Sequence, residues 1–125
     1  MSYSIGFDKK IDCIIVTVAG DFHLSAMQSL AAEVAKHLNE HGCRCILNDL
    51  RNAALSEPSS ATYKMPEAAL KAGVSRHIKR ALVVSDLSSD FRFLETVFVN
   101  QGNIVKLFVD IDEARSWISP KSTDS

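Results

Sequence analysis

Four aspartates follow apolar runs of this sequence, and their carboxylates could hold a metal ion or exchange a proton. They are Asp21, Asp49, Asp86 and Asp110, in the phrases GDF, NDL, SDL and VDI. If the apolar runs form parallel strands, these side chains gather along the sheet edge where open α/β sheets bind ligands. Hard cations prefer carboxylate oxygens, so the edge is a candidate Mg²⁺ pocket or, as a weaker alternative, the site of a hydrolase or transferase.

Aspartate at a strand end more often caps the following helix, where it accepts hydrogen bonds from free amides and complements the helix dipole. A magnesium pocket of the phosphorelay-receiver type also needs adjacent acidic residues after the first strand and a lysine after the last. The sequence has no such acidic pair and has Asp110-Ile111 instead. We therefore predict capping, with no bound metal and no cofactor.

Arg51 stands two residues after Asp49. A guanidinium beside strand-end carboxylates either closes an ion pair with Asp49 or Asp86 or holds an anionic ligand in a bidentate fork. We favour the structural pair and keep all three residues as candidate contacts for an anion or a protein partner. Phe93 falls off the helical face set by its apolar neighbours, so it is a further candidate contact unless it is tucked against the next loop.

Histidines and cysteines offer two other metal-binding patterns. His37 and His41 are four residues apart on an expected helix and share one face, where they could chelate a metal. Lys36 and Glu40 lie in the same neighbourhood, so we favour a solvated face. Cys43-x-Cys45 has no second pair to complete a zinc site, and the three cysteines lie in apolar segments, which predicts reduced, buried thiols and a cytoplasmic protein.

Motifs for nucleophilic or nucleotide chemistry are absent from the sequence. It contains no G-x-S-x-G, no P-loop and no G-x-G-x-x-G, so we predict that the protein is not an enzyme. The basic cluster RHIKR, residues 76–80, is expected to be a solvated loop. Net charge is −1 and no wider basic stripe accompanies the cluster, so nucleic-acid binding is not expected.

The pattern of apolar residues predicts alternating strands and helices. Residues 3–8 and 12–19 read as an antiparallel hairpin, followed by a helix that ends at Gly42. Three further strands, at 43–50, 80–86 and 103–110, alternate with one or two short helices in 56–73, a helix at 89–101 and a last helix after Asp110. Ser59 or Ser60 is a possible cap for the short helices, with Pro66 suited to a first turn.

Length and composition fit one domain of the α/β class. The chain has 125 residues, 46% of them hydrophobic and 23% charged. We predict a single domain over residues 1–118, a mixed sheet packed by about four helices, and a disordered tail over 119–125. No apolar run approaches the roughly 20 residues of a membrane span, so membrane insertion is not expected.

The order of elements, with AGDF, NDLR and LFVDIDEARSWI at the strand ends and at the finish, resembles the STAS domain family. The resemblance covers roughly residues 3–118 and is strongest to small stand-alone bacterial members of the anti-sigma-factor-antagonist type. It implies a non-enzymatic regulatory module that binds a protein partner and switches when a serine is phosphorylated. The family's serine directly follows the aspartate that corresponds to Asp49, and here Leu50 follows it, so we expect no such switch. We also expect a homodimer.

A second interpretation is a small-ligand or lipid-binding domain, because STAS-like folds also resemble the CRAL-TRIO lipid carriers. The apolar side chains between residues 55 and 70, Leu55, Tyr63, Met65 and Leu70, could line a cleft. A deep apolar cavity beside this segment would favour the carrier, and a filled core would exclude it.

Overall fold

The computed structural model describes residues 1–55, 59–87 and 89–119. The chain opens with an antiparallel hairpin, as predicted, formed by β1 (Ser2–Asp8) and β2 (Cys13–Phe22). Their connection is tight, because Lys10 N–H donates to the Asp8 side chain and Asp12 adopts a positive φ of 52°. The remaining elements follow in alternation: α1 (Leu24–His41), β3 (Cys45–Leu55), α2 (Ser59–Thr62), α3 (Met65–Ala72), β4 (Lys79–Val83), α4 (Ser89–Asn100), β5 (Ile104–Phe108) and α5 (Ile111–Ile118).

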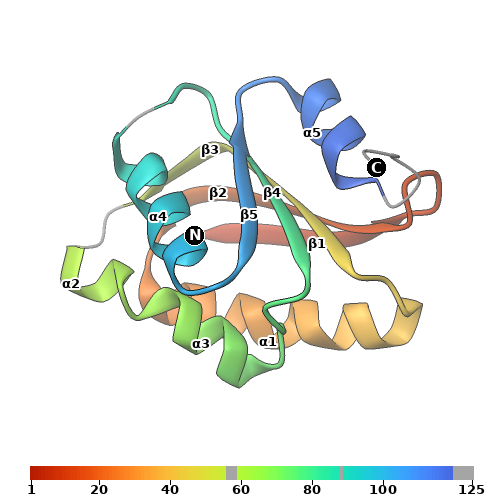
Figure 1. The fold of residues 1–125 in the computed structure, drawn as a ribbon, viewed down its shortest axis with the longest axis horizontal. Helices are drawn as coiled ribbons and strands as arrows, with labels where there is room; N and C mark the ends of the chain where they lie inside the picture. The colour runs from red at the N-terminus through yellow and green to blue at the C-terminus, as the bar shows by residue number, and fades with distance from the viewer. Residues whose placement is uncertain (56–58, 88, 120–125) are drawn as a thin grey trace.

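The five strands form one mixed sheet in the order β1-β2-β3-β4-β5, in which only the β1–β2 pair is antiparallel. Three helices, α1, α3 and α4, cover one face, and α1 and α3 lie side by side there, whereas α5 packs on the other face (Figure 1). Burial of both faces explains why the central strands read as nearly continuous apolar runs. The predicted α/β class and mixed sheet are confirmed.

Local signals fix both ends of α1 and the start of α5, and Gly42 and Asp110 act where the sequence predicted them. The helix α3 follows Lys64, which makes no side-chain cap bond, rather than Ser59 or Ser60, and Pro66 lies in its first turn as expected. The His23 side chain accepts a hydrogen bond from Ala26 N–H at the start of α1, and Gly42 ends that helix in the left-handed region at φ 63°. Asp110 accepts from the backbone N–H groups of Asp112 and Glu113 at the start of α5. Aspartate at this strand end is therefore a helix cap.

β3 is longer than predicted and contains a bulge. In its pairing with β2, Thr17 lies opposite Asp49 but Ala19 lies opposite Asn52, so β3 carries one extra residue. A bulge reverses which side chains face the core. Ile46 and Leu50 pack into the core beneath α1 before the bulge, and the odd-numbered Leu55 packs against it afterwards.

Some predictions fall wholly or partly outside the described residues. Residues 56–58 are the start of the segment 56–73 in which one or two short helices were expected, and residues 120–125 make up most of the expected disordered tail. Ser119 is described, and its N–H donates to Arg115 O at the end of α5. No helix among the described residues is long and apolar enough to cross a membrane.

Candidate functional site

Asp49 and Arg51 form a bidentate ion pair at the carboxyl end of β3. Arg51 Nε donates to Asp49 Oδ1 at 2.8 Å, and Nη2 donates to Oδ2 at 2.7 Å. The Arg51 backbone N–H also reaches Oδ1, at 3.2 Å. These bonds hold the pKa of the Asp49 carboxyl below its usual value and raise that of Arg51. Because the Arg51 side chain is 43% exposed, it presents a positioned cation to solvent.

Alternation along β3 accounts for the way this pair is presented. Leu50, between the two charged residues, is 3% exposed and packs into the core beneath α1. Strand alternation assigns Asp49 and Arg51 to the other face of the sheet, on which α5 contacts β3, β4 and β5. The side chain of Arg51 is 43% exposed there. The pair therefore lies on an open part of the sheet.

A groove lies on the other side of β3, where β3 and β4 separate. Pairing between these strands ends at Asp49 and Val83, while β3 continues with β2 as far as Leu55. The groove has a volume of about 180 Å³. Its apolar lining includes Leu50, Leu55 and Phe91, and its acidic side chains are Asp86 and Asp90.

The four strand-end aspartates do not assemble into a carboxylate cluster. Asp49 is paired with Arg51, Asp110 caps α5, Asp86 lines the groove, and Asp21 is exposed at the end of β2. In the described part of the chain, the group of three potential ligands that comes together is instead His37, Glu40 and His41 on α1. The geometry gives no support to the magnesium pocket considered from the sequence.

Phe93 lies apart from Asp49, Arg51 and Asp86. It is half-buried on α4, and its ring meets that of Tyr63 edge-on with centroids 5.4 Å apart. Phe93 is therefore tucked against the segment that joins α2 to α3, and the exposed aromatic is Tyr63, at 57%. The sequence left open whether Phe93 is an exposed contact or is packed against the next loop, and it packs against a segment that precedes α4 instead.

The residues expected to line one apolar cleft are dispersed. Met65 is fully buried and borders an interior cavity of about 90 Å³ between the sheet and the helices. Leu55 lines the groove instead, and Tyr63 and Leu70 are exposed. The four side chains do not form the predicted cleft, because only one face of this helical segment turns inward.

Arg80 is a functional candidate that the sequence analysis missed. It was expected in a solvated basic cluster but is 6% exposed and borders the interior cavity. Its guanidinium donates to Ser75 O at 3.0 Å and to Asn103 Oδ1 at 2.9 Å, and lies 5.4 Å from the Phe98 ring centroid. Burial lowers its pKa to about 10, so it remains charged at neutral pH. The burial of Arg80 could have been predicted from alternation along β4, since residue 80 shares the buried face of Leu82.

Lys79, beside Arg80, also departs from the solvated-loop prediction. Its ammonium donates to Trp117 O at 2.5 Å and lies 4.4 Å from the Trp117 ring centroid, which joins β4 to α5. The cysteine prediction is confirmed, since Cys13, Cys43 and Cys45 are unpaired and buried. The basic cluster is therefore partly structural.

Solved structures similar to this chain include two anti-sigma factor antagonists and an uncharacterized protein. An uncharacterized protein with a SpoIIAA-like fold from Shewanella loihica is 17% identical, with a TM-score of 0.60 over 93% of each chain. An anti-sigma factor antagonist from Mycobacterium paratuberculosis is 13% identical, with a TM-score of 0.59 over 94% of each chain. The anti-sigma factor antagonist SpoIIAA, in its unphosphorylated form, is 12% identical, with a TM-score of 0.57 over 90% of this chain and 94% of that one.

No protein-family model matches the sequence, and no curated protein sequence matches it. The protein has a STAS-like fold of the SpoIIAA type. At these identities the likeness establishes the fold and does not establish an activity.

Proposed function

We propose that this protein is a non-enzymatic regulatory module that binds a protein partner. The proposal rests on one observation above the others: the carboxyl end of β3 carries the exposed Asp49–Arg51 pair on one side and borders the groove toward α4 on the other. Two of the fold's solved members are named as antagonists of anti-sigma factors, which are proteins. We further propose that the module is cytoplasmic and homodimeric.

The proposal includes the absence of a serine switch beside Asp49. SpoIIAA exists in phosphorylated and unphosphorylated forms. Here the residue after Asp49 is Leu50, which carries no hydroxyl and is buried, and the next residue is bonded to Asp49. The guanidinium–carboxylate pair has no net charge and a fixed geometry, whereas phosphorylation of a serine adds negative charge that can be removed again.

The groove favours a partner segment that is both apolar and basic. Leu50, Leu55 and Phe91 border the groove, and Asp86 and Asp90 place negative charge beside them. Leu55 is the partly exposed one of the three apolar residues, because Leu50 is 3% and Phe91 is 5% exposed. A partner with one apolar anchor flanked by lysine or arginine would bury the anchor and complement both carboxylates.

The test is affinity capture from the native cell followed by mass spectrometry, with charge-reversal variants. We expect the wild type to enrich a specific protein and Asp86→Lys to lose it. Glu67→Lys is the matched control, because it makes the same charge change at an exposed position of α3. Its enrichment should equal that of the wild type.

Two outcomes would contradict the proposal at different levels. If the wild type reproducibly enriches no protein, the module function is wrong. If Asp86→Lys captures the same partner as the wild type, the groove is not the interface. Intact-mass measurement of the native protein tests the proposed absence of a serine switch. A phosphoserine whose removal changes partner binding would contradict that absence.

A second candidate function, binding of a small apolar carboxylate, is favoured by the interior cavity. The cavity lining is almost entirely apolar, with the Arg80 guanidinium and the Asn48 amide at its border. Burying a cation without a counter-charge is costly, and a ligand carboxylate would supply one. The volume of about 90 Å³ is smaller than the roughly 150 Å³ that holds benzene in an engineered cavity, so a short carboxylate fits better than a lipid.

Thermal unfolding with acetate, propionate and butyrate tests this second candidate. We expect a rise in Tm with carboxylate concentration that the uncharged propionamide does not reproduce. Ala69→Val, which adds two methyl groups to the cavity wall, should abolish the ligand effect and raise the free energy of unfolding by about 0.5–1 kcal/mol by filling space. A Tm that no carboxylate changes, or a strongly destabilised Ala69→Val protein, would exclude the candidate.

A further inference from the structure

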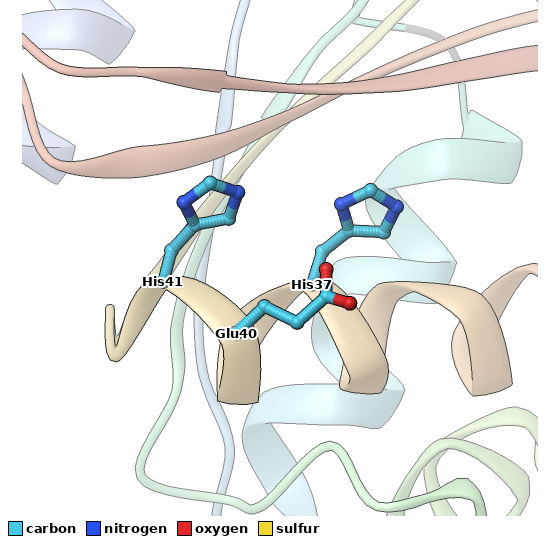
Figure 2. A group of neighbouring side chains, drawn as sticks. All are labelled: His37, Glu40 and His41. Atoms are coloured by element: carbon cyan, nitrogen blue, oxygen red, sulfur yellow. The ribbon is translucent and has the colours of Figure 1, made fainter.

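Three potential metal ligands lie on one face near the carboxyl end of α1. His37, Glu40 and His41 occupy positions i, i+3 and i+4 of the helix, which are neighbours on a helical surface. Their ligand atoms all lie within 4.8 Å of one another. Figure 2 shows both imidazole rings extending from the same side of α1, with the Glu40 carboxylate turned toward His37. The sequence predicts that the two histidines share a helical face, whereas the carboxylate that completes the set becomes evident only in the structure.

The hairpin orients the outer histidine of this group. The Phe7 ring of β1 stacks on the His41 ring, with centroids 4.1 Å apart and planes 6° from parallel. The rings of His37 and His41 are themselves within 13° of parallel, with centroids 6.4 Å apart. Face-on packing leaves the nitrogen-bearing edge of His41 free, so its contact with Phe7 is compatible with coordination.

Neighbouring charged side chains leave the group available. Glu33, one turn earlier on the same face, accepts a hydrogen bond from the Tyr3 hydroxyl. Lys36 precedes His37 and is exposed. His41 is in the last turn of α1, where the partial negative charge of the helix end favours a cation.

The chemistry of the ligands selects a borderline metal ion. Two imidazoles and one carboxylate suit Zn²⁺ better than Mg²⁺ or Ca²⁺, which prefer oxygen ligands alone. Zinc binds nitrogen at about 2.0–2.1 Å, so two of its ligand atoms lie at most about 4.2 Å apart. Glu40 and His41 are exposed and His37 is half-buried, so small side-chain rotations close the remaining gap.

We propose that His37, Glu40 and His41 form a binding site for one Zn²⁺ ion on the surface of α1. Three protein ligands leave at least one coordination position for water or for a ligand from another molecule. The site is separate from the groove and from the Asp49–Arg51 pair, and its existence does not depend on the proposed function.

Calorimetric titration of ZnCl₂ into chelator-treated, dialysed protein tests the site, at a pH about one unit above the ordinary histidine pKa of about 6.5. We expect one ion per chain. His37→Ala and His41→Ala should each weaken binding by about tenfold or more, which corresponds to about 1.4 kcal/mol per tenfold. Glu40→Gln should weaken it by a similar factor. His77→Ala is the control, because it removes an exposed histidine outside the site, and it should bind as the wild type does.

The outcomes are separable. Absence of zinc binding by the wild type, or equal losses from His77→Ala and His41→Ala, overturns the site. Unchanged binding by Glu40→Gln overturns the three-ligand geometry in favour of a two-histidine chelate. Imidazole NMR signals locate the ion independently, since those of His37 and His41 should shift on zinc addition while those of His77 stay in place.

Discussion

Arg51 can serve two purposes: it forms an ion pair with Asp49, and it presents a charged group to solvent where a partner could contact it. Its fork binds Asp49, yet 43% of its side chain remains open to solvent. Exposed ion pairs stabilise folded proteins only weakly, because solvent screens them. A geometry this well formed, at a position that stability does not require, is suited to presenting charge to a partner.

Replacing Arg51 with alanine separates these uses. The pKa of Asp49 should rise toward its ordinary value of 3.8, because the main cause of its lowering, the Arg51 side chain, is removed. Urea unfolding should change little, and capture of the partner should fall. A carboxyl-detected NMR titration measures the pKa, with Arg51→Lys as the variant that keeps the charge but loses the fork. If Asp49 titrates as before, the ion pair does not exist in solution.

The elements of this fold take their ends from single residues. Asp110 begins α5 by accepting from two backbone N–H groups, at 2.8 Å from Asp112 and 3.3 Å from Glu113. The free energy of unfolding should fall by about 1 kcal/mol in Asp110→Ala, as is typical for loss of an N-cap. Chemical denaturation measures this change. Asp110→Asn should retain most of the stability, and Asp112→Ala, a neighbouring change outside the cap position, should cost less than Asp110→Ala.

Features of this local kind were predictable from sequence, and features that depend on a neighbouring strand were not. Gly42 and Asp110 act within one turn of their own helices, so their residue types sufficed. The extra residue in β3 is defined only by pairing with β2, and it decides which side chains beyond Arg51, such as Leu55, face the core. Arg80 has the charge of a surface residue, and its burial is offset by Ser75, Asn103 and Phe98, which the chain brings together from elsewhere.

An ion pair joins the first strand of the molecule to its last helix. Arg115 of α5 donates to Asp8 of β1 at 2.8 Å, and the two residues are 107 positions apart (Figure 1 shows α5 beside the β1–β2 turn). This bond is the main reason that the pKa of Asp8 lies below its ordinary value of 3.8. Its contribution to stability is complete above that ordinary value and is lost as the pH falls through the lower folded-state pKa.

In Asp8→Asn the free energy of unfolding should therefore depend less steeply on pH in the acidic range than it does in the wild type. Near neutral pH we expect a loss of about 0.5 kcal/mol, because both side chains are partly exposed. Below about pH 3.8 the difference from the wild type should shrink, since the wild-type carboxylate is then being protonated. Urea unfolding at several pH values measures the effect. A difference that grows with acidity would contradict it.

The outer edge of the sheet bears on self-association of the whole molecule. β5 is an edge strand, and its Leu107 N–H donates to the Glu95 side chain of α4 at 2.8 Å. A side chain that occupies an edge amide hinders pairing with a strand of a second molecule. The expected homodimer should therefore form through another surface.

We expect Glu95→Ala to increase self-association beyond the dimer, with Thr96→Ala, a change at a neighbouring exposed position of α4, as the control. Light scattering over a range of concentrations measures both variants. A wild-type mass that stays monomeric at high concentration would rule out the dimer, whereas a Glu95→Ala protein that matches the wild type would show that Glu95 does not guard the edge.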